Sequence, residues 1–568
     1  MTKQESLDFH EQPIIRNAFA LLTRNLAGKD VFWAILLFLF FLFLSYRFLG
    51  LWFMQDDAAC IYGSTRAVDQ LLFDRDVYRS FNKMFYTPLL PISIKPDSLL
   101  FGVDPLGYHV LNLFAVFFSG LMGYATCRLY LPRLDSWLVA FLFVLSYPAV
   151  TNAGYLSLRH YVWGTFFTLF ALLLFKKGEE KSRVPFFLAS YGAYLVALLF
   201  KEAFAAFPGI ILLLSQGTWK RKTLKAVPYL LVFAAYVVLR FYMIGGPGGY
   251  LGLYIAPTVK GYVDHWFAQM DLVCRGTWGL RAATMIPFFL VVLALNGRAG
   301  ATLTGILLLL TAPFLVLKVP GEGDHFHLFY LPPRFLLPFF LLCALLGFTT
   351  ARARTGVSRL LAYATVAVLL ALQVTHARNA YPFMKAASEE ARALTAEALR
   401  RNGQGRNLLL ASYDAIFYTY FYESYLRITD ERKTGVTVSV TPGGDFLPLL
   451  KDLDFGSFDE VYLDGTWTEV RDEPIPFTGL TLDPDVPEAE VRFSVEDGTG
   501  TLIITDRREE IFYGVLKTLL SEKNIVYQCL PLPKNVPLRL GLSRGMDTVY
   551  VYCCSSGRCS EPVWAEAD

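Results

Sequence analysis

The stretch VFWAILLFLFFLFLSYRFLGLWFMQDD, residues 31–57, decides the fold class of this chain. Residues 31–53 are almost wholly apolar, and about 20 such residues cross the hydrocarbon core of a bilayer as a helix. No small-residue cleavage site follows the run, so we do not expect a removed signal peptide. The run is therefore predicted to be a retained membrane span, with the acidic pair Asp56-Asp57 directly after it.

Apolar runs of this kind recur along the first two thirds of the chain, which is 54% hydrophobic overall. They predict a polytopic α-helical membrane protein of about eleven spans. The predicted spans lie near residues 31–53, 109–131, 136–150, 159–175, 185–200, 203–217, 225–244, 282–296, 301–318, 331–349 and 358–376.

The loops between these spans differ in charge. Loops 131–135, 176–183, 216–225, 296–300 and 351–359 are short and rich in Lys and Arg. Because such loops stay in the cytoplasm, residues 1–30 are expected inside and the large first loop, 54–108, outside. The expected location is the cytoplasmic (inner) membrane, with the membrane domain over 31–379.

Residues 380–568 are predicted to form a soluble extracytoplasmic domain. Residues 381–568 hold 19 Lys and Arg against 30 Asp and Glu, a net charge of −11, whereas residues 1–380 carry +14. A nucleic-acid partner needs a basic soluble face, so this acidic domain argues against one.

Strand-like and helical runs alternate in this domain and predict an α/β or α+β fold. The expected strands are 407–411, 436–440, 460–463, 490–493, 501–504, 526–530 and 548–552, and helices are expected at 384–401, 413–425 and 508–520. One or two disulfides are expected among Cys529, Cys553, Cys554 and Cys559, since an exported domain permits them. A zinc site is the competing interpretation, although the domain has no histidine.

Polar residues gather on the predicted outer face, where charges near membrane depth mark cavities or function. The orientation brings together Asp56, Asp57, His109, Arg159, His160, Lys201, Glu202, His265, His325, His327 and Arg334. A carboxylate can serve as a general base on an acceptor hydroxyl, and nearby cations can stabilise a departing phosphate. Anchoring at helix ends is the structural alternative for each residue.

Several of these segments resemble the GT-C fold glycosyltransferases. The similar segments are FMQDD (53–57), TPLLPISIKPDSLLFGVDPLGYHVLNLF (87–114), LSYPAVTNAGYLSLRHYVW (145–163), LLFKEAFAAFPGIILLL (198–214) and HLFYLPPRFLLP (327–338). They span about residues 30–350, and the branch they resemble is the mannosyltransferases that use polyprenyl-phosphate sugars, including protein O-mannosyltransferase-like and bacterial members.

This resemblance implies an inverting transfer of a sugar from a polyprenyl-phosphate donor to a glycan, lipid or protein acceptor. It implies that Asp56 is the catalytic base, with Asp57 as its neighbour or substitute. Lys201 and Arg334 would face the donor phosphate. Arg159 sits at the family's arginine position and is a further expected phosphate ligand, although His160 replaces the acidic residue that often follows it. His325, His327 and Tyr330 replace the family's Glu-Arg-Tyr, which leaves their part in phosphate binding as an expectation.

Other interpretations of the same residues stay open. Asp56-Asp57 could cap a helix, Lys201-Glu202 could be a structural ion pair, and His325 and His327 could be solvated loop residues. A divalent metal held by the Asp pair and nearby histidines is an open cofactor. For the whole chain, the alternatives are a transporter or flippase for lipid-linked glycans, or a non-catalytic assembly or sensor protein.

Overall fold

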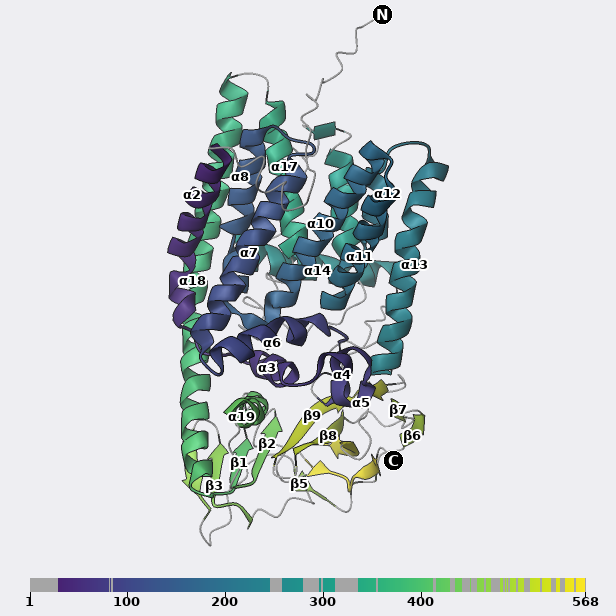
Figure 1. Ribbon diagram of the computed structural model, residues 1–568. Coiled ribbons are helices and arrows are strands. Elements are labelled where there is room, and N and C mark those ends of the chain that lie inside the picture. Colours follow the sequence, from purple (N-terminus) through teal and green to yellow (C-terminus); the bar gives the residue numbers. More distant parts are fainter. Residues whose placement is uncertain are drawn as a thin grey trace, which may run out of the picture.

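A computed structural model of the chain shows a helical bundle with a strand-rich region at one end (Figure 1). The structure describes residues 29–80, 82, 85–245, 258–278, 296–297, 300–311, 336–353, 356–411, 415–429, 435–441, 450, 457–463, 466–470, 481–483, 486, 488, 491–496, 499–504, 511–521, 524–532, 538–541, 547–555 and 558–566.

Most of the bundle is built from the predicted apolar segments, but residues 259–278, which lie between two predicted spans and were expected in an outer loop, also form a helix. Its helices are α2 (Lys29–Ser45), η1 (Tyr46–Gly50), α7 (Pro105–Cys127), α8 (Arg133–Val144), α9 (Tyr147–Gly154), α10 (Arg159–Lys181), α11 (Val184–Phe200), α12 (Phe207–Leu214), α13 (Trp219–Ile244), α14 (Val259–Trp278), α17 (Leu336–Arg352) and α18 (Gly356–Gly403). The start of α7 shows how the local sequence positions a helix. The Asp104 side chain accepts the Leu106 amide, and Pro105 begins α7, where its missing N–H is not needed.

The number of spans is smaller than predicted within the described residues. Five helices there are long and apolar enough to cross a membrane, or six if the pair α8 and α9, bent by 50°, is one span. Four shorter apolar helices cover further predicted spans, at 184–200, 202–214, 300–311 and 336–352. The predicted span 282–296 lies outside the described residues apart from its last residue. Eleven spans are therefore not confirmed, but a multi-pass membrane protein is.

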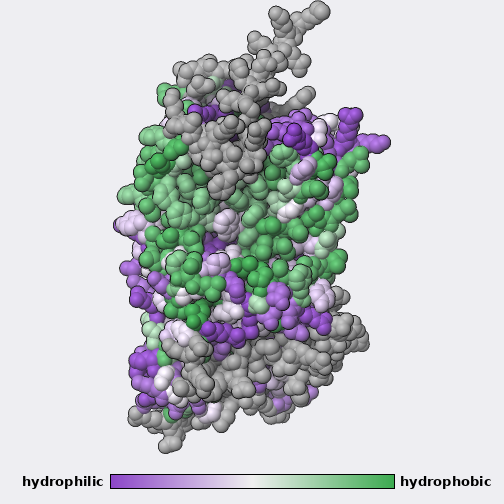
Figure 2. All heavy atoms as spheres, viewed as in Figure 1, coloured by the Kyte–Doolittle hydropathy of each residue, from purple (hydrophilic) through white to green (hydrophobic). Residues whose placement is uncertain are grey.

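The outer surface of the bundle carries an apolar belt (Figure 2). Large side chains there are more than half exposed, among them Phe32 and Phe43 on α2, Leu231 and Val238 on α13, and Leu360 on α18. Exposed apolar area of this extent is rare on soluble monomers and is expected where lipid is the solvent. The belt therefore marks the surface that faces the bilayer.

Short helices of the first loop close one end of the bundle (Figure 1). They are α3 (Asp57–Ser64), α4 (Val68–Phe73), α5 (Arg75–Arg79) and α6 (Leu89–Phe101). The C-terminal strands lie beyond them at the same end, as the predicted orientation requires. On which side of the membrane this end lies stays a prediction.

Helix α18 joins the two regions without a break. It was expected as a span at 358–376 followed by a separate helix at 384–401, with a domain boundary at 380. Instead one helix runs from Gly356 to Gly403 and contains Pro382. The boundary near 380 thus falls inside a continuous helix rather than in a loop.

The C-terminal region is an α/β arrangement around a ten-stranded mixed sheet. The strands run in the order β4-β3-β1-β2-β9-β8-β11-β12-β5, with β13 also paired to β11, and a second sheet has the order β10-β7-β6. The main sheet contains β1 (Leu408–Ala411), β2 (Thr437–Thr441), β3 (Glu460–Leu463), β4 (Thr466–Glu469), β5 (Thr481–Leu482), β8 (Ile511–Ser521), β9 (Asn524–Leu532), β11 (Asp547–Ser555), β12 (Arg558–Cys559) and β13 (Val563–Glu566), and the second contains β6 (Val491–Glu496), β7 (Thr499–Ile504) and β10 (Leu538–Gly541). Helix α19 (Ala415–Thr429) confirms the helix predicted at 413–425.

One predicted helix is wrong. Residues 508–520 were expected to be helical, but residues 511–521 form β8, paired antiparallel with both β9 and β11. The segment IFYGVLKTLLS is rich in aromatic and aliphatic residues, and two flanking strands satisfy its backbone groups. Tertiary pairing therefore overrides the local helical pattern.

The cysteines of this region are partly bridged. Cys554 and Cys559 form a disulfide across the β11–β12 pair, while Cys529 and Cys553 are buried thiols. The expectation of one or two disulfides is confirmed by this bridge. In the described part of the chain no group of three His, Cys, Asp or Glu side chains is placed to hold a metal ion, so nothing there supports the zinc alternative.

Candidate functional site

Asp57 is fully buried at the start of α3 and ties the first loop to the start of α10. Its Oδ2 accepts the backbone N–H of Met54 at 3.0 Å, and its Oδ1 accepts that of Ser157 at 2.6 Å. Ser157 belongs to η2 (Leu156–Leu158), the turn before α10. One carboxylate thus joins two segments that lie far apart in the sequence.

The environment of Asp57 disfavours its charge. Burial raises the pKa of Asp57 to about 7, and the neighbouring Asp56 adds to the rise, while the bonds from the Met54 and Ser157 amides act in the opposite direction. The effect of burial on the pKa is the larger one, because the carboxylate loses more hydration energy on burial than the two amide hydrogen bonds restore. Asp57 therefore titrates near neutral pH and is turned away from solvent.

Asp56 is placed differently from Asp57. It is only half-buried and occupies the N-cap position of α3, yet its side chain makes no capping hydrogen bond to the helix. The residue before it, Gln55, has a φ of +43°, a left-handed conformation that is uncommon outside glycine. Tyr155 donates a hydrogen bond from its hydroxyl to Gln55 Oε1 at 3.4 Å. The acidic pair thus follows a left-handed turn at Gln55, and the Asp56 side chain does not cap α3.

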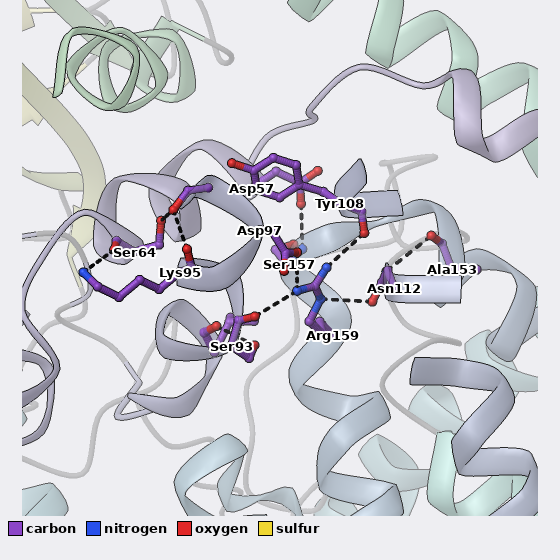
Figure 3. A network of polar contacts seen from close by, with 12 residues as sticks. Asp57, Ser64, Ser93, Lys95, Asp97, Tyr108, Asn112, Ala153, Ser157 and Arg159 are labelled. Carbon is purple, nitrogen blue, oxygen red and sulfur yellow. Dashed lines mark hydrogen bonds and ion pairs between the residues drawn. The ribbon is translucent and has the colours of Figure 1, made fainter. Parts of the chain in front are cut away.

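A second buried carboxylate holds the arginine predicted to bind phosphate (Figure 3). Arg159 Nη1 lies 2.6 Å from Asp97 Oδ2, and both side chains are 2% exposed. The guanidinium also donates to the Ser93 carbonyl at 3.1 Å and the Tyr108 carbonyl at 3.0 Å. The N–H groups of this guanidinium are already bonded to oxygen atoms of the protein. Arg159 is therefore better placed to hold α10 against α6 than to bind a phosphate.

Asn112 on α7 completes this network (Figure 3). Its Oδ1 accepts from Arg159 Nε at 3.3 Å, and its Nδ2 donates to carbonyls at the end of α9, including that of Ala153 at 3.3 Å. One buried network of polar groups beside Asp57 therefore joins the first loop, α7, α9 and α10. A polar network of this kind fixes its members only when its groups are paired.

Lys201 and Glu202 form a separate group where α11 ends. Lys201 Nζ lies 3.5 Å from Glu202 Oε1 and 3.5 Å from the centroid of the Phe85 ring. Arg240 of α13 adds a second cation, with Nη1 3.8 Å from Glu202 Oε2. The ion pair offered as the structural alternative is therefore present, and the group as a whole holds one more positive than negative charge.

The remaining predicted residues divide into two sets. His109 is fully buried, with Nε2 3.1 Å from the Leu51 carbonyl oxygen, and His160 is 8% exposed with its ring 4.2 Å from that of Tyr161. Both lie within the packed bundle. His325, His327, Tyr330 and Arg334 lie outside the described residues, so their roles stay predictions.

Four structural partners were missed by sequence reasoning: Gln55, Asp97, Asn112 and Arg240. Arg240 carried a usable signal, because a charge inside the predicted span 225–244 marks function or pairing. Asp97 and Asn112 lie within the segment 87–114 that resembles the GT-C family, but neither residue gave a separate signal. Nothing in the sequence marks Gln55, since its importance is a backbone conformation.

A metal site at the acidic pair finds no support in this geometry. Both oxygens of Asp57 accept backbone amides, and His109 faces a carbonyl oxygen. Across the residues that the structure describes, no three potential ligands converge.

Comparison with known proteins gives only remote similarity. No family model matches the chain, and no curated protein is significantly similar to it. Among solved structures, the apo state of ArnT from Cupriavidus metallidurans is similar at 12% identity and a TM-score of 0.45, over 72% of this chain and 86% of that one. The same protein bound to undecaprenyl phosphate is similar at 13% identity and a TM-score of 0.44, with the same coverage. Likeness at this level is too remote to transfer residue roles.

Proposed function

We propose that this chain is an inverting glycosyltransferase of the GT-C class. It takes a sugar from a polyprenyl-phosphate donor in the bilayer and passes it to an acceptor hydroxyl at the outer face of the cytoplasmic membrane. The observation that carries the proposal is the Asp56-Asp57 turn. The Asp57 carboxylate accepts two backbone amides, and it thereby holds the neighbouring, half-buried Asp56 at the end of the bundle.

The two aspartates have different roles in this proposal. Asp56 is the base that accepts the proton of the acceptor hydroxyl. Asp57 is a positioning residue, because its oxygens are already bonded to Met54 and Ser157. Asp56 is therefore the base, and Asp57 does not substitute for it.

The reaction needs no further co-reactant. The acceptor oxygen forms a bond to the anomeric carbon as its proton passes to Asp56. The bond between that carbon and the phosphate oxygen breaks, and polyprenyl phosphate leaves with the electron pair. Attack from the side opposite the leaving group inverts the anomeric configuration, as in inverting glycosidases.

Cations would stabilise the leaving phosphate. Lys201 and Arg240 supply positive charge at the ends of α11 and α13, offset in part by Glu202. We propose that the donor phosphate is bound on this side, with Arg334, His325, His327 and Tyr330 as further expected ligands. Arg159 instead holds α6 against α10 through Asp97.

The test is the pair of variants Asp56→Asn and Asp57→Asn in the full chain, reconstituted with polyprenyl-phosphate-linked sugars. Release of polyprenyl phosphate is the readout. Loss of the base should lower the rate by on the order of 10²–10⁴-fold. Full activity in Asp56→Asn would remove Asp56 from the mechanism. The wild type is also assayed in membranes that supply native acceptors. If it turns over no polyprenyl-phosphate sugar there, the proposed transferase function is wrong.

A further inference from the structure

Basic residues gather where α11 and α13 begin, at the end of the bundle opposite the C-terminal strands (Figure 1). Lys181 ends α10 and Arg183 precedes α11, while Lys220, Arg221 and Lys222 lie in the first turn of α13. The segments 176–183 and 216–225, to which they belong, together hold eight Lys and Arg against two Glu, a net charge of +6.

Most of these five cations are left at the surface by a neighbouring network. One acid of the two segments, Glu179, accepts from Lys176 Nζ at 2.8 Å, from Lys225 Nζ at 2.6 Å and from the Gln216 backbone N–H at 3.1 Å. These bonds fix the turn before α13 against the end of α10. The other acid, Glu180, is exposed and offsets one of the five charges. The surface therefore keeps an excess of positive charge.

The helix faces that continue from these cations are apolar. Val184 and Leu188 on α11, and Leu224 on α13, are more than half exposed. The two helices pack against each other, and the ring centroids of Tyr191 on α11 and Tyr229 on α13 lie 4.7 Å apart. Their exposed side chains therefore belong to the apolar belt (Figure 2).

Trp219 marks the level at which the charged and apolar surfaces meet. Its large side chain is more than half exposed at the first residue of α13, and Lys222 Nζ lies 5.3 Å from its ring centroid. Tryptophan is enriched at the boundary between hydrocarbon and headgroups, because its ring is apolar and its N–H is polar. The cations beside it therefore lie at the depth of the lipid phosphates.

We propose that the five cations, Trp219 and the first turns of α11 and α13 form a binding surface for anionic phospholipids. The cations hold the acidic headgroup, and the acyl chains lie along the apolar faces of the two helices. Under the predicted orientation these lipids belong to the cytoplasmic leaflet. The interaction goes beyond the proposed function and does not depend on it.

The surface fits an anionic lipid better than a zwitterionic lipid or a soluble acidic protein. Each Lys or Arg close to an anionic membrane surface strengthens binding by about fivefold. A zwitterionic headgroup carries its own cation and loses much of this gain. A soluble protein would leave the exposed apolar side chains next to the cations without a partner, whereas acyl chains cover them.

The experiment uses the full chain in neutral detergent. Native mass spectrometry gives the dissociation constants of phosphatidylglycerol and phosphatidylcholine with the same acyl chains. The test variant combines Lys220→Gln, Arg221→Gln and Lys222→Gln, and the five basic residues that remain in the two segments keep the orientation signal. The matched control removes three exposed basic residues from the opposite end of the molecule: Lys385→Gln, Arg400→Gln and Arg558→Gln.

We expect the wild type to bind phosphatidylglycerol at least about tenfold more tightly than phosphatidylcholine. In the test variant, phosphatidylglycerol binding should weaken by about 10- to 100-fold, at about fivefold for each cation removed with some screening. The control should bind as the wild type does. Equal affinity of the wild type for the two lipids, or equal phosphatidylglycerol affinity in the test and control variants, would overturn the proposal.

A second measurement needs no variant and so does not depend on how well a variant folds. The wild type is placed in nanodiscs of phosphatidylglycerol or of phosphatidylcholine, and the difference in unfolding temperature is measured at about 0.1 M and 1 M NaCl. Salt shortens the screening length from about 10 Å to about 3 Å over this range. The stabilisation by phosphatidylglycerol should therefore shrink, and a stabilisation that salt leaves unchanged would contradict headgroup binding by these cations.

Discussion

The Oδ1 atom of Asp57 lies 2.6 Å from the backbone nitrogen of Ser157, so the turn after the first span is bonded to the turn before α10. The second oxygen of the same carboxylate accepts the amide of Met54. These two bonds set the position of Asp56, the next residue back along the chain. A single buried side chain therefore places the proposed base.

Asp57→Ala should lower transfer activity without removing the base. The variant leaves two buried amides without an acceptor, which costs about 1–3 kcal/mol for each one left unpaired. If Asp56 moves by about 1 Å as a result, the rate falls by on the order of 10²-fold. The check is the rate constant at saturating donor alongside the donor KM: a positioning role predicts a lower kcat with little change in KM.

Stability of the first loop should depend on pH through Asp57. Its pKa is raised from 3.8 in the unfolded chain to about 7 in the fold. The folded state thus binds this proton more tightly, and the stabilisation from protonation is full below about pH 4 and is lost as pH rises towards 7. Hydrogen exchange of residues 54–64 measures this in wild type and Asp57→Asn. The variant should lose the pH dependence, and identical pH profiles would contradict the prediction.

Breaking the Arg159–Asp97 pair should destabilise the bundle end strongly. Asp97→Ala leaves a buried guanidinium without its counter-charge, which costs about 3–5 kcal/mol. Replacing both partners with apolar residues, as in Asp97→Leu with Arg159→Met, should cost less than Asp97→Ala alone. Thermal unfolding in nanodiscs compares the two. A direct phosphate ligand would instead show a raised donor KM in Arg159→Lys with unchanged unfolding temperature.

The C-terminal region should be required for activity through α19. Phe421→Ala removes the ring that contacts Trp52 and Phe53, and a buried Phe-to-Ala change costs about 3–5 kcal/mol. We expect slower transfer and faster hydrogen exchange at residues 52–58, with normal membrane insertion. Exchange in that segment that matches the wild type would show that α19 does not hold the loop.

The two tyrosines of α19 should respond in opposite directions when their hydroxyls are removed. Tyr418→Phe deletes a buried group that has no partner in the described structure, so the unfolding temperature should rise. Tyr422→Phe deletes a donor to Asn402 and should lower it. A lower unfolding temperature for Tyr418→Phe would mean that its hydroxyl is already satisfied in the free protein.

Much of the architecture follows from local sequence. Long apolar runs identify membrane helices whatever surrounds them, because a bilayer requires each helix to satisfy its own backbone and to present apolar side chains. For this reason α2, α7, α10 and α13 were placed correctly. Loop charges also placed the Asp56-Asp57 turn and the C-terminal region at the same end of the bundle, as the structure has them.

Only the tertiary structure separated the two aspartates. They are adjacent and chemically identical, yet Asp57 bonds to Ser157 while Asp56 does not cap α3. Burial and hydrogen-bond partners depend on segments brought together from far apart in the chain, and no local pattern records them. The same cause explains why β8 is a strand between β9 and β11 and why Arg159 faces Asp97. The hydrophobicity of a segment is a sum over its own residues, so it can be calculated from the sequence. The partner of a buried polar atom is instead decided by how distant segments pack together.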